Sequence, residues 1–517
     1  MKYLMAIDAG TGSVRAVIFD EDGNQISFGQ REWTHNEEEG VANSMSFDFK
    51  KNWELLKVCI KEAIEKSNID SHMIVAVSAT SMREAIVLYD KDGNELWAVA
   101  NVDARADKEV KTLKEEFMGV EEEFYKKSGQ TFALGALPRI LWVKNNLPNI
   151  YKKVVKISMI SDWILYKLSG VIASDPSNGG TSGIFSLKNR DWLPSMAEKV
   201  GIKSDIFPPC FEVGEVIGKV SNKEVELSPD TKVVMGGGDV QLGSAGLGVV
   251  EVGDVAVFGG SFWQQVVNID SSVTPPNDMD LRVNPHVIPN QSQAEGITFF
   301  SGLIMRWFRD AFCDLEKLEA KKSGKDVYTI LESKASKIPV GSHGIIPIFS
   351  DSMKYKKWYH ASPSFLNLSI DPDICNKASM FRSLQENAAI VSDINIKKIE
   401  SFSGVKTKEI VFAGGASRGF LWPQILADVT GVKVKIPRVT EATALGCAMA
   451  AGVGIGIYKD LKSAAKQIVV WDREYTPNIE NFDKYQEIKK TWQEAYDLQL
   501  KLVDRGITTS MWKAPGI

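Results

Sequence analysis

The chain has 517 residues, 25% of them charged and 44% hydrophobic, and carries a formal net charge of −5. A single hydrophobic core rarely grows beyond roughly 250–300 residues, so this length predicts at least two domains. The slightly acidic composition and the lack of a basic run argue against a nucleic-acid partner, and no stretch reaches the roughly 18 apolar residues of a membrane span.

The spacing of the cysteines and the sequence of the first residues indicate the cellular compartment of the protein. Five cysteines without a C-x-x-C spacing are typical of reduced thiols, and not of a disulfide framework or a zinc site. The first residues lack the pattern of a secretory signal. We therefore expect a cytoplasmic protein with no membrane partner.

The chain begins with two apolar runs, residues 3–9 and 14–20, whose period-two alternation predicts paired strands. Between them lies the sequence DAGTGS at residues 8–13. Glycines let backbone N–H groups approach a ligand closely, and successive amides in a tight turn can form an anion-binding nest. Taken alone, the segment is equally consistent with an ordinary glycine-rich hairpin.

The side chains around this turn suit a nucleotide phosphate. Thr11 and Ser13 offer hydroxyl donors, and Arg15 adds a positive charge. Asp8 would repel a bare phosphate, so its presence favours a bound cation such as Mg²⁺ between the two.

The rest of the first half reads as a mixed α/β domain. A third strand is expected after the turn at residues 22–24, and residues 46–68 predict an amphipathic helix with Ser46 as its N-cap. Residues 73–81 predict a short apolar strand. A hairpin is expected around the Asp-Gly-Asn turn at residues 92–94.

A glycine-rich stretch at residues 236–260 marks the expected domain boundary. We place an N-terminal domain at 1–245, a C-terminal domain at 246–460 and a helical tail that packs on the body at 461–517. Residues 253–269 again read as strand, small-residue turn and strand, and this echo of the first hairpin indicates a duplicated domain. A strand, glycine turn and helix follow at 409–431, and a small-residue helix at 441–456.

The echo supplies a second candidate phosphate turn, Gly259-Gly260-Ser261. The sequence has neither a Walker A motif nor G-x-G-x-x-G, which argues against a P-loop or Rossmann site. Two phosphate hairpins from two similar domains are the arrangement of actin, hexokinase and Hsp70. The expected fold class is therefore α/β, with two actin-like (ribonuclease H-like) ATPase domains and a catalytic cleft between them.

The chain resembles the FGGY carbohydrate kinases over nearly its whole length. AIDAGTGSVRAVIFD is similar to their first phosphate motif, and GGGDVQLGSAGLG to their G-G-D-Q-Q segment, whose aspartate is the catalytic base. FAGGASRGFLWPQILADVTG and EATALGCAMAAGVGIG resemble their adenosine-site signature, while SMRE and DAR occupy places where the family holds substrate. The resemblance implies ATP-dependent phosphoryl transfer to an alcohol group, with Mg²⁺.

The resemblance also implies roles for single residues. Asp239 would be the general base, although an aspartate there could instead cap a helix that begins near Val240. The implied Mg²⁺ ligands, through water, are Asp8 and Asp239. The implied nucleotide contacts are Thr11, Gly12, Ser13, Arg15, Gly260, Ser261, Gly302, Gly414, Gly415 and Ser417, and which of Gly260 and Ser261 contacts phosphate stays open.

Four residues are implied at the substrate end. Arg83 and Glu84 would bracket hydroxyl and carbonyl groups, the alternative being that they pair with each other on the surface. Asp103 and Arg105 would close the same site or brace it from behind. The Gly414, Gly415 and Ser417 turn, taken alone, is equally a plain strand-to-helix connection.

The sequence departs from ordinary sugar kinases at four places. Asn101 stands where the family has Trp, Val240 where it has Gln, and Gly259-Gly260-Ser261 where it has G-T-S or G-T-G. Residues 350–360 replace its G-E-R-x-P loop. Because most of these changes concern the substrate end, they favour a substrate unlike the usual pentuloses or glycerol.

Long strings such as SMREAIVLY, DPSNGGTSG and WYHASPSFLNLSIDPD resemble those bacterial members of the family that phosphorylate linear 4,5-dihydroxy-2,3-pentanedione, a quorum-sensing signal, at its C5 hydroxyl. We expect this small molecule as the substrate. The alternatives are a pentulose or polyol kinase and, outside enzymes, an actin-like ligand sensor. A homodimer and a regulatory phosphocarrier protein are further possible partners, on which the sequence is silent.

Overall fold

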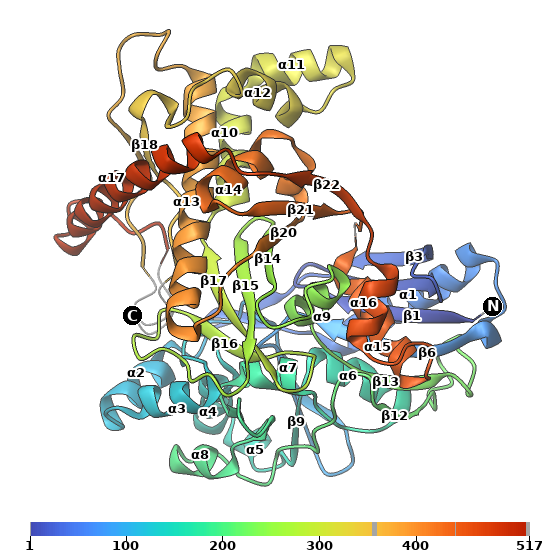
Figure 1. Cartoon of the computed structure of the whole chain (residues 1–517). Helices are drawn as coiled ribbons and strands as arrows, with labels where there is room; N and C mark the ends of the chain where they lie inside the picture. Colours follow the sequence, from blue (N-terminus) through green and yellow to red (C-terminus); the bar gives the residue numbers. More distant parts are fainter. Residues whose placement is uncertain (1, 354–358, 440, 513–517) are drawn as a thin grey trace.

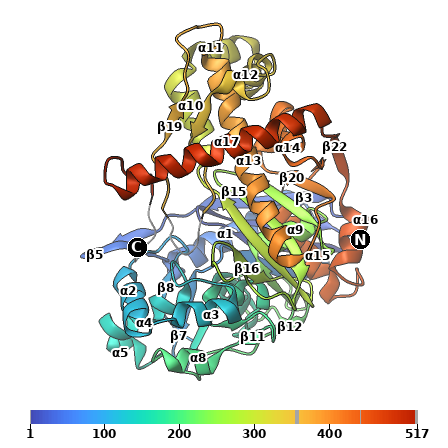
Figure 2. The same ribbon diagram turned by 60° about the vertical axis from the view of Figure 1, so that its left-hand side comes forward.

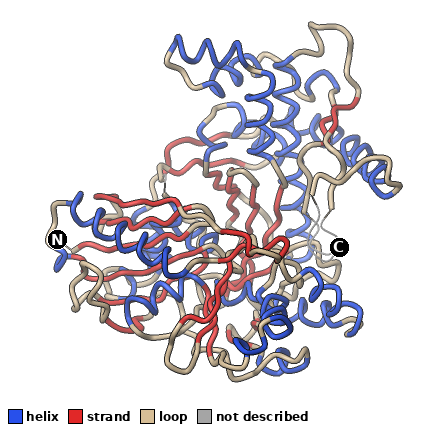
Figure 3. The backbone as a smooth tube through the Cα atoms, turned by 180° about the vertical axis from the view of Figure 1, so that it is seen from behind, coloured by secondary structure: helices blue, strands red, loops and turns tan. Residues whose placement is uncertain are grey.

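A computed structural model of the chain describes residues 2–353, 359–439 and 441–512. Residues 354–358 of the divergent 350–360 loop and residues 513–517 of the expected tail therefore lie outside the described residues. We call residues 2–246 the N-terminal half and residues 247–512 the C-terminal half. The strands run through the middle of the molecule and most helices lie toward its outside (Figure 3).

The N-terminal half is built on a six-stranded mixed sheet. Strands β1, β6 and β13 are parallel, and β2 and β3 continue the sheet as an antiparallel meander. The hairpin and the third strand predicted for residues 3–32 are confirmed. In sheet order the strands are β12 (Val216–Lys219), β13 (Lys232–Gly238), β6 (Ile74–Ser81), β1 (Tyr3–Ala9), β2 (Ser13–Asp20) and β3 (Gln25–Glu32).

Helix α1 (Phe49–Ser67) covers one face of this sheet and buries Leu56 and Ile60 against it. It begins after Asp48, whose carboxylate accepts a hydrogen bond of 3.0 Å from the Lys51 amide. The expected N-cap at Ser46 is wrong, because Ser46 is the last residue of strand β5 (Val41–Ser46). Two polar residues lie close together here, and the nearer one to the apolar repeat caps the helix.

A second sheet and most helices of this half gather at one end of the molecule (Figures 1 and 2). The hairpin predicted around residues 92–94 is confirmed as β7 and β8. The remaining elements are β4 (Asn36–Glu38), β7 (Ile86–Tyr89), β8 (Glu95–Val99), β9 (Lys156–Met159), β10 (Phe185–Ser186), β11 (Asp191–Trp192), α2 (Asp107–Glu116), α3 (Val120–Ser128), α4 (Ala136–Asn146), α5 (Pro148–Tyr151), α6 (Ile160–Ser169), α7 (Pro176–Gly179), α8 (Pro194–Lys199) and α9 (Asp239–Gly246).

The C-terminal half repeats the core of the first sheet. Its strands β14 and β15 form an antiparallel hairpin, β14 runs parallel to β20, and β20 runs parallel to β21, as β1, β2, β6 and β13 do. The predicted duplication is thus confirmed. In sheet order the strands are β16 (Arg282–Pro285), β17 (Gln291–Thr298), β15 (Trp263–Asp270), β14 (Val255–Gly259), β20 (Glu409–Ala413), β21 (Lys433–Pro437) and β22 (Trp471–Tyr475).

Helices α10, α11 and α12 lie at the end of the molecule opposite α2–α5, and α17 runs across this half as one long helix (Figures 1 and 2). Helix α17 buries Tyr485, Trp492 and Tyr496, in agreement with the helical tail expected to pack on the body. The elements are α10 (Ser301–Phe312), α11 (Asp314–Ser323), α12 (Val327–Ala335), β18 (Ile346–Ile348), β19 (Ser364–Leu366), α13 (Lys377–Ser403), α14 (Leu421–Thr430), α15 (Ala442–Gly454), α16 (Leu461–Ile468) and α17 (Ile479–Asp504). Of the helices in the described ranges, none is long and apolar enough to cross a bilayer.

The small-residue helix α15 returns to the N-terminal half and packs on the sheet face opposite α1 and on α9. A Cβ atom on Gly446 would lie 1.9 Å from the Leu242 carbonyl oxygen, and one on Gly246 would lie 2.0 Å from the Ala442 carbonyl oxygen. The backbones of α9 and α15 therefore touch where a side chain would hold them apart. Because α9 begins at Asp239, this contact fixes the position of that residue.

The variant Gly446→Ala tests this contact. We expect the free energy of unfolding in urea to fall by about 1–3 kcal/mol, the usual cost of overpacking a buried site. The control is Gly218→Ala in β12, where the nearest atom lies 3.4 Å from the added Cβ. Equal stability of the two variants would contradict close helix contact.

Candidate functional site

Three adjacent parallel strands end at the same edge of the N-terminal sheet. Ala9 of β1 and Gly238 of β13 are both in register with Ser81 of β6. Asp8, Arg83 and Asp239 therefore come together, although they are far apart in the sequence. Ligands of open α/β sheets bind outside the carboxyl ends of the strands, so this edge is the candidate site.

Asp8 lies on β1 directly opposite Arg15 of β2. Burial and the nearby Asp239 carboxylate raise the pKa of Asp8 to about 7, against the opposing effect of Arg15. The Arg15 guanidinium also forms an ion pair with Glu441, the residue that precedes α15. The turn between β1 and β2 is thus tied to the C-terminal half.

Hydrogen bonds hold the carbonyl groups of the turn at residues 10–12, while the space beside Gly12 is open. The Thr11 carbonyl accepts a 2.7 Å hydrogen bond from His35 Nε2, and Trp33 Nε1 donates to the Gly10 carbonyl at 2.9 Å. The Thr11 hydroxyl and the Asn101 amide lie 3.0 Å apart and are hydrogen-bonded. No atom of the described residues lies within 4 Å of where a Cβ on Gly12 would be, so a ligand can approach the backbone there.

Asp239 is the first residue of α9, and a third of its side chain is exposed. Its Oδ1 atom accepts a 2.8 Å hydrogen bond from the Val240 amide and lies 3.7 Å from Arg83 Nε. Burial raises the pKa of Asp239 to about 6, although Arg83 and the Val240 amide oppose the shift. The capping interpretation is wrong, because α9 already begins at Asp239 and its N-cap is Gly238, with no side-chain cap hydrogen bond. The carboxylate accepts only the amide of the next residue.

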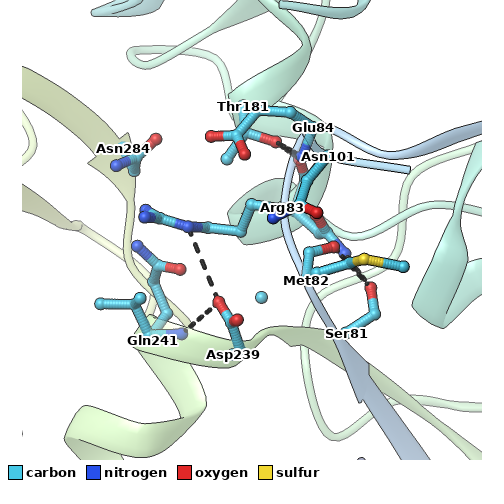
Figure 4. Close-up of polar contacts among 12 residues, drawn as sticks. Ser81, Met82, Arg83, Glu84, Asn101, Thr181, Asp239, Gln241 and Asn284 are labelled. Atoms are coloured by element: carbon cyan, nitrogen blue, oxygen red, sulfur yellow. Dashed lines mark hydrogen bonds and ion pairs between the residues drawn. The ribbon is translucent and has the colours of Figure 1, made fainter. Parts of the chain in front are cut away.

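Arg83 and Glu84 are buried and pair with partners from the C-terminal half. Figure 4 shows Arg83 beside Asp239. Arg83 Nη1 and Nη2 donate to both carboxylate oxygens of Glu295, at 2.6 and 2.9 Å. Glu84 lies 2.5 Å from Arg282 Nη1. The alternative in which Arg83 and Glu84 pair with each other on the surface is wrong. Sequence reasoning missed Arg282 and Glu295, and the one available signal was a run of polar residues inside a strand.

Asp103 and Arg105 lie behind this edge. The Arg105 guanidinium is buried between the rings of Trp97 and Trp142, 5.2 and 4.8 Å from the ring centres. It donates from Nε to Asp103 at 2.8 Å and forms a second ion pair with Glu38. This is the bracing arrangement of the two that the sequence left open, and direct contact of either residue with substrate stays a prediction.

Arg139 of α4 was also missed and organises the same region. Its guanidinium donates to the backbone carbonyls of Glu84 at 2.6 Å, Asn101 at 2.7 Å and Asp103 at 2.6 Å. Burial lowers the pKa of Arg139. The signal for it was a lone arginine on the apolar face of a helix.

The C-terminal half contains a cavity of about 670 Å³ whose wall includes four residues expected to bind nucleotide, namely Gly260, Ser261, Gly302 and Gly415. Gly414 and Ser417 belong to the same turn but lie outside this lining. The Ser417 hydroxyl donates to the Gly414 carbonyl at 2.9 Å and is buried. Lining residues that sequence reasoning missed include Arg306, Arg309, Asp326, Tyr328 and Gln385.

The glycines of this cavity bring three chain segments together. A Cβ on Gly302 would lie 2.2 Å from the Gly260 carbonyl oxygen, and one on Gly414, whose φ is +94°, would lie 2.9 Å from the Gly259 carbonyl oxygen. The Gly302 amide donates to the Ser261 carbonyl at 3.0 Å. The backbones thus form a wall that a flat ring can approach closely.

The site offers two carboxylates, Asp8 and Asp239, for a cation. Within the described parts of the chain, no group of three or more His, Cys, Asp or Glu side chains is arranged to hold a metal ion. Mg²⁺ usually takes one or two protein carboxylates and completes its shell with water and phosphate oxygens. Burial and, after it, the Asp239 charge raise the pKa of Asp8, and a cation beside the two carboxylates would offset both effects.

Sequence comparisons match two domain models of one family. The N-terminal domain of the FGGY family of carbohydrate kinases matches residues 3–246, and its C-terminal domain matches residues 266–455. Curated relatives include "Autoinducer-2 kinase" of Yersinia enterocolitica and of Salmonella typhimurium, each 56% identical over 519 residues, and of Klebsiella pneumoniae, 54% identical over 521 residues. Each comparison covers 100% of this chain and 98% of the relative.

Solved structures show the same fold. A ligand-bound xylulose kinase from Lactobacillus acidophilus is similar with a TM-score of 0.84 and 19% identity, covering 96% of this chain and 98% of that one. Plasmodium falciparum glycerol kinase with ADP is similar with a TM-score of 0.83 and 18% identity, covering 97% of this chain and 98% of that one. The expected fold class, α/β with two actin-like domains, is confirmed.

The raised pKa of Asp8 predicts a pH-dependent stability. The folded state holds the Asp8 proton up to about pH 7, whereas the pKa of a free aspartate side chain is 3.8. The free energy of unfolding should therefore fall as pH rises between these values. We expect Asp8→Asn to unfold with on the order of 1–3 kcal/mol more free energy than the wild type near pH 8, and with no difference below about pH 4.

Chemical denaturation across this pH range measures the difference. Asp230→Asn is the control, since Lys219 lowers the pKa of that exposed carboxylate, and its removal should bring no gain near neutral pH. A stability of Asp8→Asn equal to that of the wild type at every pH would contradict the buried-charge account.

Proposed function

The chain belongs to the FGGY family of carbohydrate kinases, and from that premise we propose that it phosphorylates autoinducer-2. The acceptor would be the C5 hydroxyl of linear 4,5-dihydroxy-2,3-pentanedione, with ATP as the phosphoryl donor. The likeness over the full length to curated autoinducer-2 kinases supports this acceptor. The observation that carries the chemistry is the Asp239 carboxylate beside Arg83, at the strand edge that also holds the first phosphate turn.

In this proposal Asp239 acts as the general base. Its exposed carboxylate would accept the proton of the acceptor hydroxyl as that oxygen attacks the γ-phosphorus of ATP. A pKa of about 6 keeps the group mostly unprotonated at neutral pH while it remains basic enough to accept a proton. Arg83 would orient the carboxylate and the acceptor oxygen, and Glu84 would accept from a neighbouring hydroxyl.

The nucleotide would lie between the two glycine turns. Backbone amides of Thr11, Gly12 and Ser13, with the Arg15 charge, would face the phosphates from one half, and Gly260 and Ser261 from the other. Gly302 and the turn at residues 414–417 would border adenosine in the cavity described above. Asp8 and Asp239 would hold Mg²⁺ through water. When bound, Mg²⁺ supplies neutralisation of phosphate charge.

The domain limits 1–245, 246–460 and 461–517 remain part of the proposal. The two family domains and the two sheets support a division near residue 246. The tail is less separate, because its strand β22 completes the seven-stranded sheet and its helix α16 packs with α15. A cytoplasmic location, a homodimer and a regulatory phosphocarrier protein also remain predictions.

An acceptor panel tests the substrate. Release of ADP would be measured with the dione, xylulose, ribulose, glycerol and erythritol at equal concentration. We expect the highest kcat/KM with the dione, by about tenfold or more. A preference for a pentulose or a polyol would favour the alternative kinase, and no turnover of any acceptor would favour a ligand sensor of the same fold.

The variant Asp239→Asn removes the base while it keeps a polar side chain at the start of α9. The asparagine Oδ1 atom can still accept from the Val240 amide, so folding and ATP affinity should be kept while kcat falls by about 10²–10⁴. Asp460→Asn, at the N-cap of α16 where Asp460 accepts from the Ser463 amide at 2.7 Å, is the control and should keep full activity. Turnover of Asp239→Asn near that of the wild type would refute the assignment.

The wild-type pH profile provides a second readout. The kcat/KM value should fall below about pH 6 as Asp239 becomes protonated. Asp8 also titrates close to this range, so the profile is repeated with Asp8→Asn. The fall of kcat/KM at acidic pH should persist in that variant, even if its activity is lower. Loss of this fall in the variant would assign it to Asp8.

A further inference from the structure

Four charged side chains cross between the two halves at the substrate end. Arg83 pairs with Glu295 and Glu84 pairs with Arg282. Arg282 and Glu295 are register partners on the neighbouring strands β16 and β17, so one rigid strand pair presents both. We call Arg83, Glu84, Arg282 and Glu295 the charge quartet. Two positive and two negative charges balance within it.

The quartet is buried, and this makes its pairing obligatory. Glu295 has no exposed surface, and Arg83, Glu84 and Arg282 are 5, 8 and 8% exposed. An unpaired charge in such a place is strongly destabilising, because it lacks the solvation that water would give it. Asn284 adds a long hydrogen bond of 3.4 Å from Nδ2 to Glu295 Oε2. Glu295 is therefore held in place from two sides.

The pairing determines what Arg83 can still bind. A planar guanidinium recognises a carboxylate best through two parallel hydrogen bonds. In Arg83 this fork, Nη1 and Nη2, already holds the two oxygens of Glu295, while Nε faces Asp239 at 3.7 Å. An acceptor that reached Asp239 would thus find the two terminal nitrogens of Arg83 already paired. A carboxylate on that acceptor would also be repelled by the Asp239 carboxylate.

Apart from Glu84 and the Met82 thioether, the groups labelled around Arg83 and Asp239 in Figure 4 are uncharged amides and hydroxyls. Asn101, Thr181, Gln241 and Asn284 lie about Arg83 and Asp239 (Figure 4). The Thr181 hydroxyl accepts from the Glu84 amide at 3.1 Å. Such groups donate to and accept from hydroxyl and carbonyl oxygens without a charge preference.

We infer that Glu295 determines specificity: by occupying the fork of Arg83 it excludes carboxylate-bearing acceptors and leaves the site selective for uncharged hydroxy-carbonyl compounds. This deepens the proposed function and rests on it for the position of the acceptor. Selectivity of this kind works by opposing the wrong ligand rather than by adding contacts to the right one. A purely structural role for the pair would affect all acceptors alike.

The test compares a neutral acceptor with a five-carbon aldonate, which carries a carboxylate and a terminal hydroxyl. Glu295→Gln keeps the shape of the side chain and frees the charge of Arg83. We expect the ratio of kcat/KM for the aldonate to that for the neutral acceptor to rise about 10-fold or more, the scale of one charge-assisted hydrogen bond. Glu295→Asp keeps the negative charge and should keep the wild-type ratio. An unchanged ratio in folded Glu295→Gln, or an equal rise in Glu295→Asp, would overturn the inference.

A matched control and a wild-type measurement complete the test. Glu212→Gln removes another two-point Arg–Glu pair, in which Arg190 donates to both Glu212 oxygens at 2.6 Å, and its acceptor ratio should stay at the wild-type value. In the wild type itself, calorimetry should show the aldonate binding about 10-fold or more weaker than xylulose or the dione. Equal affinity would overturn the inference even if Glu295→Gln failed to fold. If xylulose is turned over and the dione is not, the proposed substrate fails while the ratio with xylulose still tests Glu295.

Discussion

The burial of two carboxylates, Asp8 and Asp239, at one sheet edge is the constraint around which the rest of the structure is arranged. The ends of β1 and β13 hold these two carboxylates at one sheet edge, where burial raises the pKa of both, to about 7 and about 6. A protein that only had to be stable would not place two acids there, since each loses solvation and the Asp239 charge opposes ionisation of Asp8. In the proposed complex a cation would offset this electrostatic cost, and perturbed pKa values of this kind are typical of functional sites.

Neighbours of these two aspartates form ion pairs that join the two halves. Arg15, opposite Asp8, pairs with Glu441 at the start of α15, and Arg83, beside Asp239, pairs with Glu295 of β17. Helix α9, which begins at Asp239, touches α15 through Gly246 and Gly446. Any relative movement of the halves must therefore change the environment of both aspartates. The ionisation of Asp8 and Asp239 is therefore physically coupled to the relative position of the two halves.

Features that depend on neighbouring residues could be predicted from the sequence, whereas contacts between distant segments could not. The hairpins at residues 3–20 and 255–270 were predictable because strand alternation and glycine turns are local signals, and Asp239 because its motif is contiguous. Glu295, Arg282 and Arg139 were missed because their roles exist only once distant segments meet. The error at Ser46 was local as well: Asp48 lies closer to the apolar repeat of α1, and the backbone at Ser46 already belongs to a strand.

Strand β17 shows why acceptor chemistry and stability are difficult to separate in this protein. Gln293 and Glu295 are buried on a strand covered on both faces, where apolar residues would be expected. Each is satisfied by a specific partner: Gln293 donates to Ser244 and to Asn268 at 3.0 Å, and Glu295 accepts from Arg83. A buried polar group is tolerated only while such partners are present. The hydrogen bonds from Arg83 that satisfy buried Glu295 on β17 also occupy both terminal nitrogens of Arg83. Selection for a stable strand and selection against acidic acceptors therefore act on the same atoms.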